Sequence, residues 1–254
     1  MQQRVPELDI VVPVFNEGEL ISSLLDSLHR DVKTPWRLLI CYDLERDDTL
    51  PAIERYPHRK DLDIEFVKNP GRGPNSAVLA GFRAARAPAV LTYTADDDYN
   101  AVIIDRMVKM IREGHDVVTG SRFIPGGTFE GCAWLKAVLS RIASITLYHL
   151  ARHPIHDATN CLRMFSRRLL EDVSIESTEG FIFALELAVK AHRLGWKVGE
   201  VPAQWHERRS GKSRFQIAKW FGPYLRWYFY AFATTWLGRG PKTVPRREAT
   251  KALA

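Results

Sequence analysis

At residues 89–98 the chain reads Ala-Val-Leu-Thr-Tyr-Thr-Ala-Asp-Asp-Asp, an apolar run followed directly by three carboxylates. The short, uninterrupted run predicts a buried strand over 89–95. Neighbouring carboxylates raise one another's pKa unless a cation lies beside them, and open α/β sheets bind ligands at the carboxyl ends of their strands. We therefore expect Asp96 and Asp98 to bind a divalent metal, Mg²⁺ or Mn²⁺, that carries phosphate groups. A solvated turn that caps a helix near residue 101 is the alternative explanation for the same acids.

This strand belongs to an alternating series of strands and helices. Short apolar runs predict further strands at 8–14, 36–42, 62–67, 115–119 and 197–202. Apolar residues at helical spacing predict helices at 17–30, 76–86, 101–113, 135–151 and 181–194. Such alternation implies an α/β fold with a Rossmann-like, doubly wound, mainly parallel sheet. A chain of 254 residues, 46% of them hydrophobic, can bury one large core of this kind.

The charge of the chain is unevenly distributed. Its formal net charge is +6, yet residues 205–254 contain eleven Lys or Arg and two Glu, so the remainder is slightly acidic. A basic end suits anionic phosphates, a membrane surface or nucleic acid. No nucleic-acid-binding motif accompanies it, so we expect a membrane surface as partner and no nucleic acid. The three cysteines, Cys41, Cys132 and Cys161, lie far apart, form no zinc pattern, and suit a reducing cytoplasm.

Residues 215–237 are densely aromatic. Lys219, Pro223 and Arg226 interrupt the stretch, so it lacks the run of about 20 apolar residues that a spanning helix needs. Trp and Tyr favour the headgroup region of a bilayer, and a helix with Lys and Arg can lie in that plane. We predict an amphipathic interfacial helix over 215–238 and a basic, flexible tail over 239–254. A helix packed in the core is the alternative, since aromatic stripes usually are core.

Further segments accompany the acids in a fixed order. They are Val12-Pro13-Val14-Phe15-Asn16-Glu17, Gly120-Ser121-Arg122-Phe123, Glu179-Gly180-Phe181 with Glu186, Glu200-Val201-Pro202 and Arg208-Arg209-Ser210-Gly211-Lys212-Ser213-Arg214. In this order and spacing the set resembles the inverting family-2 nucleotide-sugar glycosyltransferases. Within them it is most similar to the dolichyl- or polyprenyl-phosphate mannosyltransferases and their glucosyl relatives. The resemblance covers residues 8–214 and implies a GT-A type nucleotide-sugar-binding domain over 1–214.

The resemblance implies roles for residues around the sugar donor. It places Pro13, Phe15 and Glu17 against the base and ribose, with Asp43 also beside the nucleotide. It makes Asp96 and Asp98 a metal-binding Asp-x-Asp pair, Asn100 an assisting polar residue, and Asp97 a spacer or a sugar contact. Arg208, Ser213 and Arg214 match a loop that closes over the diphosphate, where guanidinium groups suit phosphate oxygens. Without the resemblance, this loop reads as a basic surface turn.

The acceptor side is the most specific part of the resemblance. A lipid phosphate is already an anion, so it needs cations that position it and no general base. The resemblance implies that Arg122, Lys136 and Ser140 bind this phosphate, and that Asp157 touches the sugar or orients Arg122. Relatives have Arg where Lys136 stands, a change that keeps the charge and loses the bidentate fork. Asp98, Arg122 and Arg208 are the residues we expect to carry catalysis.

One segment departs from the family pattern. After the second strand, relatives usually have Asp-Asp-Gly-Ser-x-Asp-x-Thr, whereas this chain reads Tyr42-Asp43-Leu44-Glu45-Arg46-Asp47-Asp48-Thr49. An acid in this segment can contact the base, so the choice between guanine and uracil stays open. The donor is accordingly expected to be GDP-mannose or a UDP-hexose.

The resemblance predicts a metal-dependent, inverting glycosyltransferase. It would move a hexose, mannose first and glucose second, from a nucleotide diphosphate to a polyprenyl phosphate. We expect it to act as a cytoplasmic, peripheral protein on the inner face of the membrane. Two alternatives stay open: transfer to a glycan or other hydroxyl acceptor, which requires a carboxylate base, and a non-catalytic nucleotide-sugar-binding protein.

Overall fold

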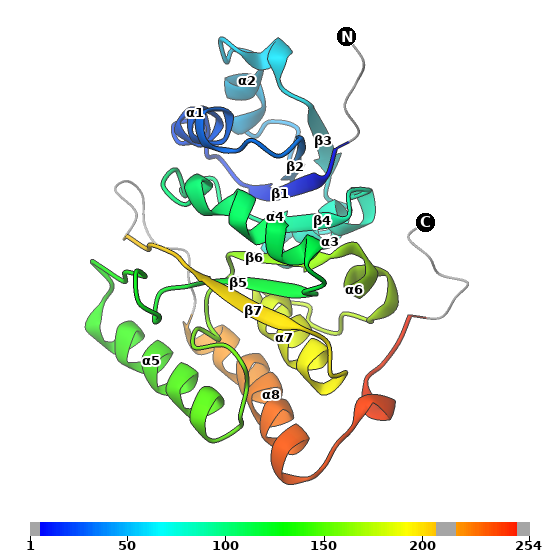
Figure 1. Ribbon diagram of the computed structural model, residues 1–254. Helices are drawn as coiled ribbons and strands as arrows, with labels where there is room; N and C mark the ends of the chain where they lie inside the picture. The colour runs from blue at the N-terminus through cyan, green and yellow to red at the C-terminus, as the bar shows by residue number, and fades with distance from the viewer. Residues whose placement is uncertain (1–5, 207–216, 248–254) are drawn as a thin grey trace.

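A mixed sheet runs through the computed structural model, which describes residues 6–206 and 217–247 (Figure 1). Within these residues the sheet has seven strands in the order β3-β2-β1-β4-β6-β5-β7. β6 is antiparallel to β4 and β5, and the other neighbouring pairs are parallel. The strands are β1 (Leu8–Val14), β2 (Trp36–Tyr42), β3 (Ile64–Lys68), β4 (Ala89–Thr92), β5 (Val117–Ser121), β6 (Arg163–Ser166) and β7 (Val198–Pro202).

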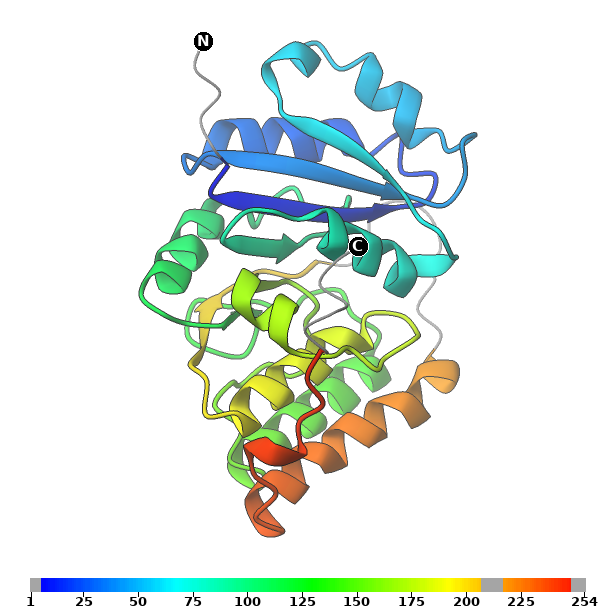
Figure 2. The ribbon, with the colours of Figure 1, turned by 90° about the vertical axis from the view of Figure 1, so that its right-hand side faces the viewer.

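Helices cover both faces of the sheet. One buried cluster joins the sheet to α1, α2 and α4, and a second joins its other face to α3, α6 and α7. A third cluster packs α5 and α8 against α7, on the side of α7 away from the sheet (Figures 1 and 2). The helices are α1 (Ile21–Asp31), α2 (Thr49–Glu54), α3 (Gly73–Ala84), α4 (Ile104–Arg112), α5 (Trp134–His149), α6 (Arg167–Asp172), α7 (Ile182–Arg193) and α8 (Ile217–Trp236).

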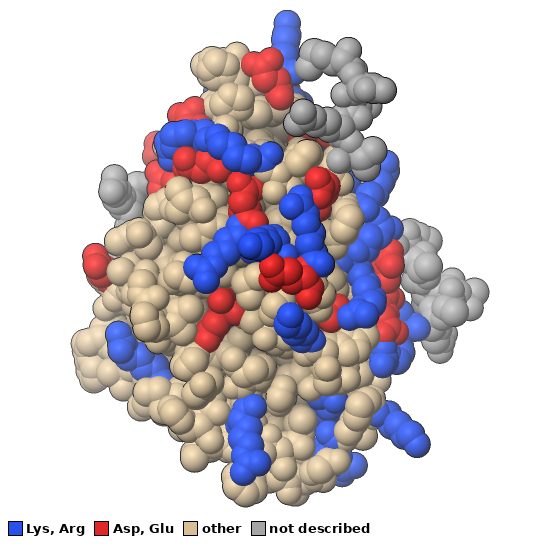
Figure 3. Space-filling view, viewed as in Figure 1, with Lys and Arg blue, Asp and Glu red and all other residues tan. Residues whose placement is uncertain are grey.

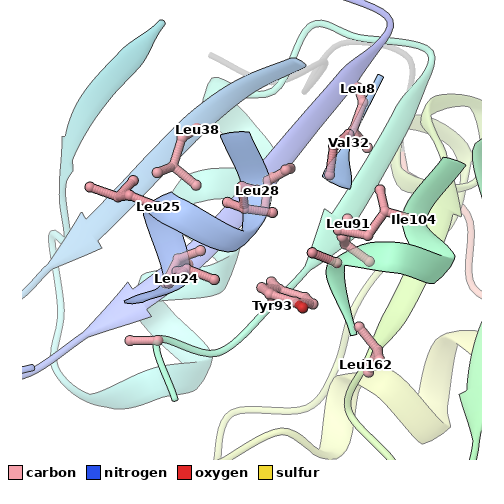
Figure 4. Close-up of a cluster of buried hydrophobic side chains, with 14 of the residues drawn as sticks. Leu8, Leu24, Leu25, Leu28, Val32, Leu38, Leu91, Tyr93, Ile104 and Leu162 are labelled. Atoms are coloured by element: carbon pink, nitrogen blue, oxygen red, sulfur yellow. The ribbon is translucent and has the colours of Figure 1, made fainter. Parts of the chain in front are cut away.

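The cluster under α1 shows how the sequence pattern builds the core (Figure 4). Leu24, Leu25 and Leu28 recur at helical spacing and are fully buried. They pack in one cluster with Leu38 of β2 and Leu91 of β4. Full burial of one such side chain contributes about 1.5–3 kcal/mol relative to exposure.

The predicted doubly wound, mainly parallel α/β sheet is confirmed, and β1 and β2 have the predicted bounds. The strand predicted over 89–95 was too long: β4 ends at Thr92. The Tyr93 backbone N–H still donates to Val11 O (3.0 Å), and a turn then forms in which Asp97 N donates to Thr94 O (3.2 Å). β6 was not predicted from the sequence, because its four residues include the buried Arg163 and show no strand period.

The aromatic helix α8 packs into the protein along one face. Trp227 is 1% exposed, and its Nε1–H donates to Ser177 Oγ (2.9 Å). Tyr224, Tyr228, Tyr230 and Phe232 pack against the same third cluster. Phe229 and Trp236 are exposed. The alternative prediction, a helix packed in the core, therefore holds for one face of α8. This face packs on α7 and α5 rather than on the sheet. None of the described helices is long and apolar enough to cross a membrane.

Two glycines in helices make opposite predictions for the same substitution. A Cβ on Gly81 of α3 would lie 2.3 Å from Val11 Cγ1 and 2.8 Å from Cys41 Sγ, so α3 could not lie as close to the sheet. Gly81→Ala is expected to lower the free energy of unfolding by about 1–3 kcal/mol. At Gly222 of α8 a Cβ would meet nothing within 4 Å. Gly222→Ala is therefore expected to raise the free energy of unfolding by up to about 1 kcal/mol, because alanine favours a helix more than glycine does. Urea unfolding of both variants measures the two signs, and equal effects would contradict the packing argument.

Candidate active site

A cavity of about 940 Å³ opens at the carboxyl ends of the strands. Its walls come from residues that end or follow β1, β2, β4, β5 and β7, and from α5, α7 and α8. This is the edge at which open α/β sheets bind ligands. Of the predicted site residues, those that line the cavity are Pro13, Phe15, Glu17, Asp43, Asp96, Asp97, Asn100, Arg122, Lys136 and Ser140.

The turn after β1 forms one end of the cavity and is held by the loop after β2. Asn16 has a left-handed backbone (φ 53°), and its N–H donates to both carboxylate oxygens of Asp47 (3.1 Å each). Glu17 N–H donates to Thr49 Oγ1 (2.9 Å). Asp47 and Thr49, which keep their place in the family pattern, therefore fix the turn that presents Pro13 and Glu17.

Asp43 joins this end of the cavity to the loop before α3. Its Oδ2 accepts from Gly73 N (2.8 Å), and its Oδ1 accepts from Asn69 Nδ2 (2.5 Å). Asn69 is buried, and its Oδ1 accepts in turn from Gly71 N (3.0 Å) and Ser76 Oγ (2.7 Å). The carboxylate is thus fixed at the cavity wall.

The three acids after β4 differ in how far they are exposed to solvent. Asp96 and Asp98 are exposed, whereas Asp97 is 8% exposed. Burial raises the pKa of Asp97 to about 6, and the hydrogen bonds from Asn100 N (3.0 Å) and Nδ2 (2.8 Å) offset only part of that rise. Asp96 and Asp97 line the cavity, and Asp98 does not. The structure therefore makes Asp97 more than a spacer: it is the buried anchor of the acidic loop.

Asn100 joins the acidic loop to the chain after β7. Its Nδ2 donates to Gln204 O, and its Oδ1 accepts from Gln204 N, both at 2.9 Å. Asn100 is 2% exposed. Both ends of the amide are used in bracing the loop, and the metal-assisting role stays a prediction.

The described part of the chain contains no group of three His, Cys, Asp or Glu side chains that could bind a metal by itself. Mg²⁺ usually keeps several waters and binds through one or two carboxylates together with substrate phosphates. Two exposed carboxylates, Asp96 and Asp98, therefore fit an ion that arrives with a diphosphate.

Arg122 and Asp157 form a buried ion pair at the other end of the cavity. Arg122 Nε and Nη2 donate to the two carboxylate oxygens of Asp157 (2.6 and 2.8 Å), and Arg122 N–H donates to Oδ2 (3.0 Å). Burial alone would raise the pKa of Asp157, but the Arg122 guanidinium outweighs burial and lowers it. Asp157 therefore orients Arg122.

Ser140 and Thr159 lie beside this pair. Arg122 Nη2 donates to Thr159 Oγ1 (2.7 Å) and lies 3.4 Å from Ser140 Oγ. Lys136, one turn before Ser140 on α5, lines the same cavity. Two cationic and two hydroxyl side chains thus meet at one place, a set that suits a phosphate group.

Mainly apolar side chains from the outer helices also line the cavity. They come from three helices: Leu139, Ala143 and Leu147 of α5, Leu185 of α7, and Tyr224, Leu225 and Tyr228 of α8. The cavity therefore combines polar side chains from the strand ends with mainly apolar side chains from the outer helices.

The cavity does not include every predicted residue, and it includes residues that were not predicted. Arg208, Ser213 and Arg214 lie outside the described residues. Glu186 is fully buried and pairs with Lys190 (2.6 Å), so this acid has a structural role. The cavity residues Phe129, Thr159, Trp205 and His206 were not predicted from the sequence. Thr159 lies two residues after Asp157, which the resemblance marks, whereas no local pattern marks the other three.

The ion pair predicts a pH-dependent loss of stability. Asp157→Asn leaves Arg122 buried without a charge partner, so the free energy of unfolding should fall by about 3–5 kcal/mol near neutral pH. The lowered pKa of Asp157 stabilises the wild type above the ordinary aspartate pKa of about 3.9, and this stabilisation is lost as the pH falls through the lower folded-state pKa. The difference between the two proteins should therefore shrink on acidification.

Urea unfolding between about pH 7 and pH 3 measures this difference. Asp61→Asn, at an exposed position, is the matched control and should change stability by no more than about 0.5 kcal/mol. A difference that stays constant with pH would contradict the assigned pairing.

Comparisons with known proteins identify the family of the chain. The family described as Glycosyl transferase family 2 matches residues 9–174. Polyprenol monophosphomannose synthase of Mycolicibacterium smegmatis is 28% identical over 228 residues, covering 83% of this chain and 85% of that protein. Dolichyl-phosphate hexose transferase of Haloferax volcanii is 29% identical over 206 residues, covering 80% of this chain and 84% of that protein.

The fold also has solved relatives. Glucosyl-3-phosphoglycerate synthase from Mycobacterium tuberculosis, in complex with Mn²⁺, uridine diphosphate and phosphoglyceric acid, is similar with a TM-score of 0.65. The match has 15% sequence identity and covers 98% of this chain and 88% of that one. At that identity the likeness concerns the fold alone, which is of the GT-A type.

Proposed function

The chain belongs to glycosyl transferase family 2 and is a glycosyltransferase, and on that premise we propose that it transfers a hexose from a nucleotide diphosphate to a polyprenyl phosphate. Mannose from GDP-mannose is the first candidate, and glucose from UDP-glucose is the second. Two relatives are named for transfer to polyprenol or dolichyl phosphate, which supports this acceptor.

The shape of the cavity carries the proposal. Arg122, Lys136 and Ser140 line the same cavity as the mainly apolar side chains of α5, α7 and α8. A phosphate on a long hydrocarbon chain has the same two-part chemistry. Its anionic head would meet the cations, and the first part of its chain would lie along Leu139 and Leu147.

The donor occupies the opposite end in this proposal. Pro13, Phe15, Glu17 and Asp43 would contact the nucleoside, with Asp97 shaping the sugar side of the acidic loop. Asp96, with Asp98 next to it, would bind Mg²⁺ or Mn²⁺, which supplies positive charge to the leaving diphosphate when bound. A Mn²⁺-bound fold relative is consistent with this metal choice. Arg208, Ser213 and Arg214, which lie outside the described residues, would add donor-phosphate contacts.

The chemistry needs few proton transfers. An oxygen of the acceptor phosphate would attack the anomeric carbon as the bond from that carbon to the nucleotide diphosphate breaks, which inverts the configuration. The electron pair of the broken bond leaves with the diphosphate. Because the attacking oxygen is already anionic, Arg122 and Lys136 position it, and no general base is required.

A donor panel tests the reaction. The protein is mixed with Mn²⁺, a short polyprenyl phosphate and GDP-mannose or UDP-glucose, and the released nucleotide and the glycolipid are measured. Asp96→Ala should lower turnover about 100-fold or more, the usual loss for a key charge-stabilising group. Asp98→Ala tests the second acid in the same way, and Asp61→Ala is the exposed control that should keep full turnover.

Other results would replace the proposal. Turnover with a sugar hydroxyl and none with polyprenyl phosphate would assign a hydroxyl acceptor. Nucleotide-sugar binding without release of nucleotide, whatever the acceptor, would assign a binding protein.

A membrane surface is the second part of the proposal, with the protein peripheral on the cytoplasmic face. The outward side of α5 exposes large apolar residues, as do the outward parts of α8. They are Trp134, Leu135, Val138, Leu139, Ile142, Ile145, Phe229, Trp236 and Leu237. Figure 3 shows this lower part of the molecule as mainly uncharged, with scattered Lys and Arg side chains. α5 and α8 lie together, because Tyr228 OH donates to Thr146 Oγ1 (2.8 Å) and Trp236 Nε1 donates to Leu150 O (2.8 Å).

Flotation with vesicles of anionic phosphatidylglycerol measures this contact. Combined replacement of Trp134, Ile142 and Ile145 by Ser should abolish most flotation, since each apolar side chain contributes about 1.5–3 kcal/mol when buried. Val102→Ser is the matched control, because Val102 is 63% exposed but precedes α4, on another part of the molecule. Equal flotation of the triple variant and the wild type would remove the membrane role of α5.

A further inference from the structure

A row of aromatic rings stands beside the cations of the acceptor end. It consists of Phe123, Phe129 and Trp205, which we call the aromatic wall. The Phe123 and Phe129 ring centroids are 5.8 Å apart, and those of Phe129 and Trp205 are 5.0 Å apart. Two of the rings follow β5, and the third follows β7, so tertiary structure alone brings them together.

Each ring of the wall lies next to a cation. Arg122 Cζ is 4.3 Å from the centroid of Phe129, Lys136 Nζ is 5.2 Å from that of Trp205, and Arg141 Cζ is 5.2 Å from that of Phe123. All three distances are within the reach of about 6 Å over which a ring face attracts a cation. The aromatic wall therefore holds the positive charges of Arg122, Lys136 and Arg141 near one another. Without the rings, repulsion between these charges would move the flexible side chains apart.

Backbone hydrogen bonds fix Phe129 beside Trp205. Thr128 N donates to Ala203 O (3.1 Å), Trp205 N donates to Thr128 O (3.0 Å), and Glu130 N donates to Trp205 O (2.9 Å). On its other side, the backbone of Gln204 bonds to Asn100 of the acidic loop. The segment that carries Trp205 is thus hydrogen-bonded both to the acidic loop, through Asn100, and to the segment that carries Phe129.

The surroundings of Arg122 limit how a ligand can reach it. Asp157 occupies Nε and Nη2, and Phe129 lies over one face of the guanidinium. Among the described residues, none accepts a hydrogen bond from Nη1. We propose that Phe129 and Trp205 are positioning residues for the acceptor phosphate: they orient Arg122 toward the cavity through Nη1 and hold the Lys136 ammonium beside it. The proposal rests on the proposed function, since it assumes an anionic acceptor at these cations.

The contact with Trp205 matters because the residue at position 136 is a lysine. A compact ammonium on a flexible stem lacks the geometric preference of a guanidinium fork. The Trp205 ring gives that ammonium a preferred place, which the side chain alone would not have.

Steady-state kinetics with polyprenyl phosphate test the wall. Phe129→Leu removes the ring, and the KM for polyprenyl phosphate should rise about 3- to 30-fold, the factor that corresponds to the usual strength of a cation–π contact. The KM for the nucleotide sugar should change less than about twofold, since Phe129 contacts the acceptor end. Phe129→Tyr keeps the ring and should keep the wild-type KM. Trp205→Leu and Trp205→Phe repeat the comparison for Lys136, and thermal unfolding checks that each variant is folded.

The possible outcomes are distinct. A wild type that glycosylates polyprenyl phosphate, together with an unchanged KM in Phe129→Leu and Trp205→Leu, would overturn the wall and leave the proposed function standing. A wild type without activity on polyprenyl phosphate would overturn both. Equal rises in KM for donor and acceptor, or failure of Phe129→Tyr to restore the KM, would show a purely structural role and overturn the positioning role.

Discussion

The buried ion pair between Arg122 and Asp157 is the constraint on which the acceptor end depends. The Asp157 carboxylate is fully buried, and it accepts from the side chain and backbone of Arg122 and from the backbone of Asn160 (3.1 Å). Removing either partner would leave an unpaired charge in the interior, at a cost of about 3–5 kcal/mol. The end of β5 and the turn before β6 are therefore locked together. The same ion pair holds Thr159, whose N–H donates to Asp157 Oδ1 (3.2 Å) and whose Oγ1 accepts from Arg122 Nη2 (2.7 Å).

A second constraint is the outer layer formed by α5 and α8. Helices that cover a sheet usually turn a polar face to solvent, but α7 is buried on both sides, since α8 and α5 pack against it. The space between these helices extends the cavity with apolar walls. The proposed acceptor needs this extension, because a phosphate pocket alone would suit any small phosphorylated compound. The same layer leaves the outward side of α5 apolar and uncovered, which is the basis for the proposed membrane contact.

Local patterns in the sequence predicted much of the fold and part of the site. Period and apolar runs were sufficient for β1, β2 and the alternation with helices, because those strands are buried on both faces and end at clear turns. They were insufficient for β6, which is short and contains Arg163, and for the end of β4. The order of the motifs predicted a shared site, and the cavity is lined by five of its predicted residues: Pro13, Asp43, Asp96, Arg122 and Lys136. The motif order could not show that Asp97 is buried, nor that the Asn100 amide braces Gln204, which lies over 100 residues away in the chain.

The sequence by itself determined the fold family, the strand ends that carry the acids and Arg122, and the chemistry available there, since these follow from local periodicity and from motifs of fixed spacing. Tertiary structure decided which side chains are free to meet a ligand. It buried Asp97, it placed one face of the aromatic helix α8 in the core, and it set Phe129 and Trp205 among the cations. These outcomes depend on contacts between segments distant in the chain, where burial and hydrogen-bond geometry, rather than residue type, determine what each side chain can do.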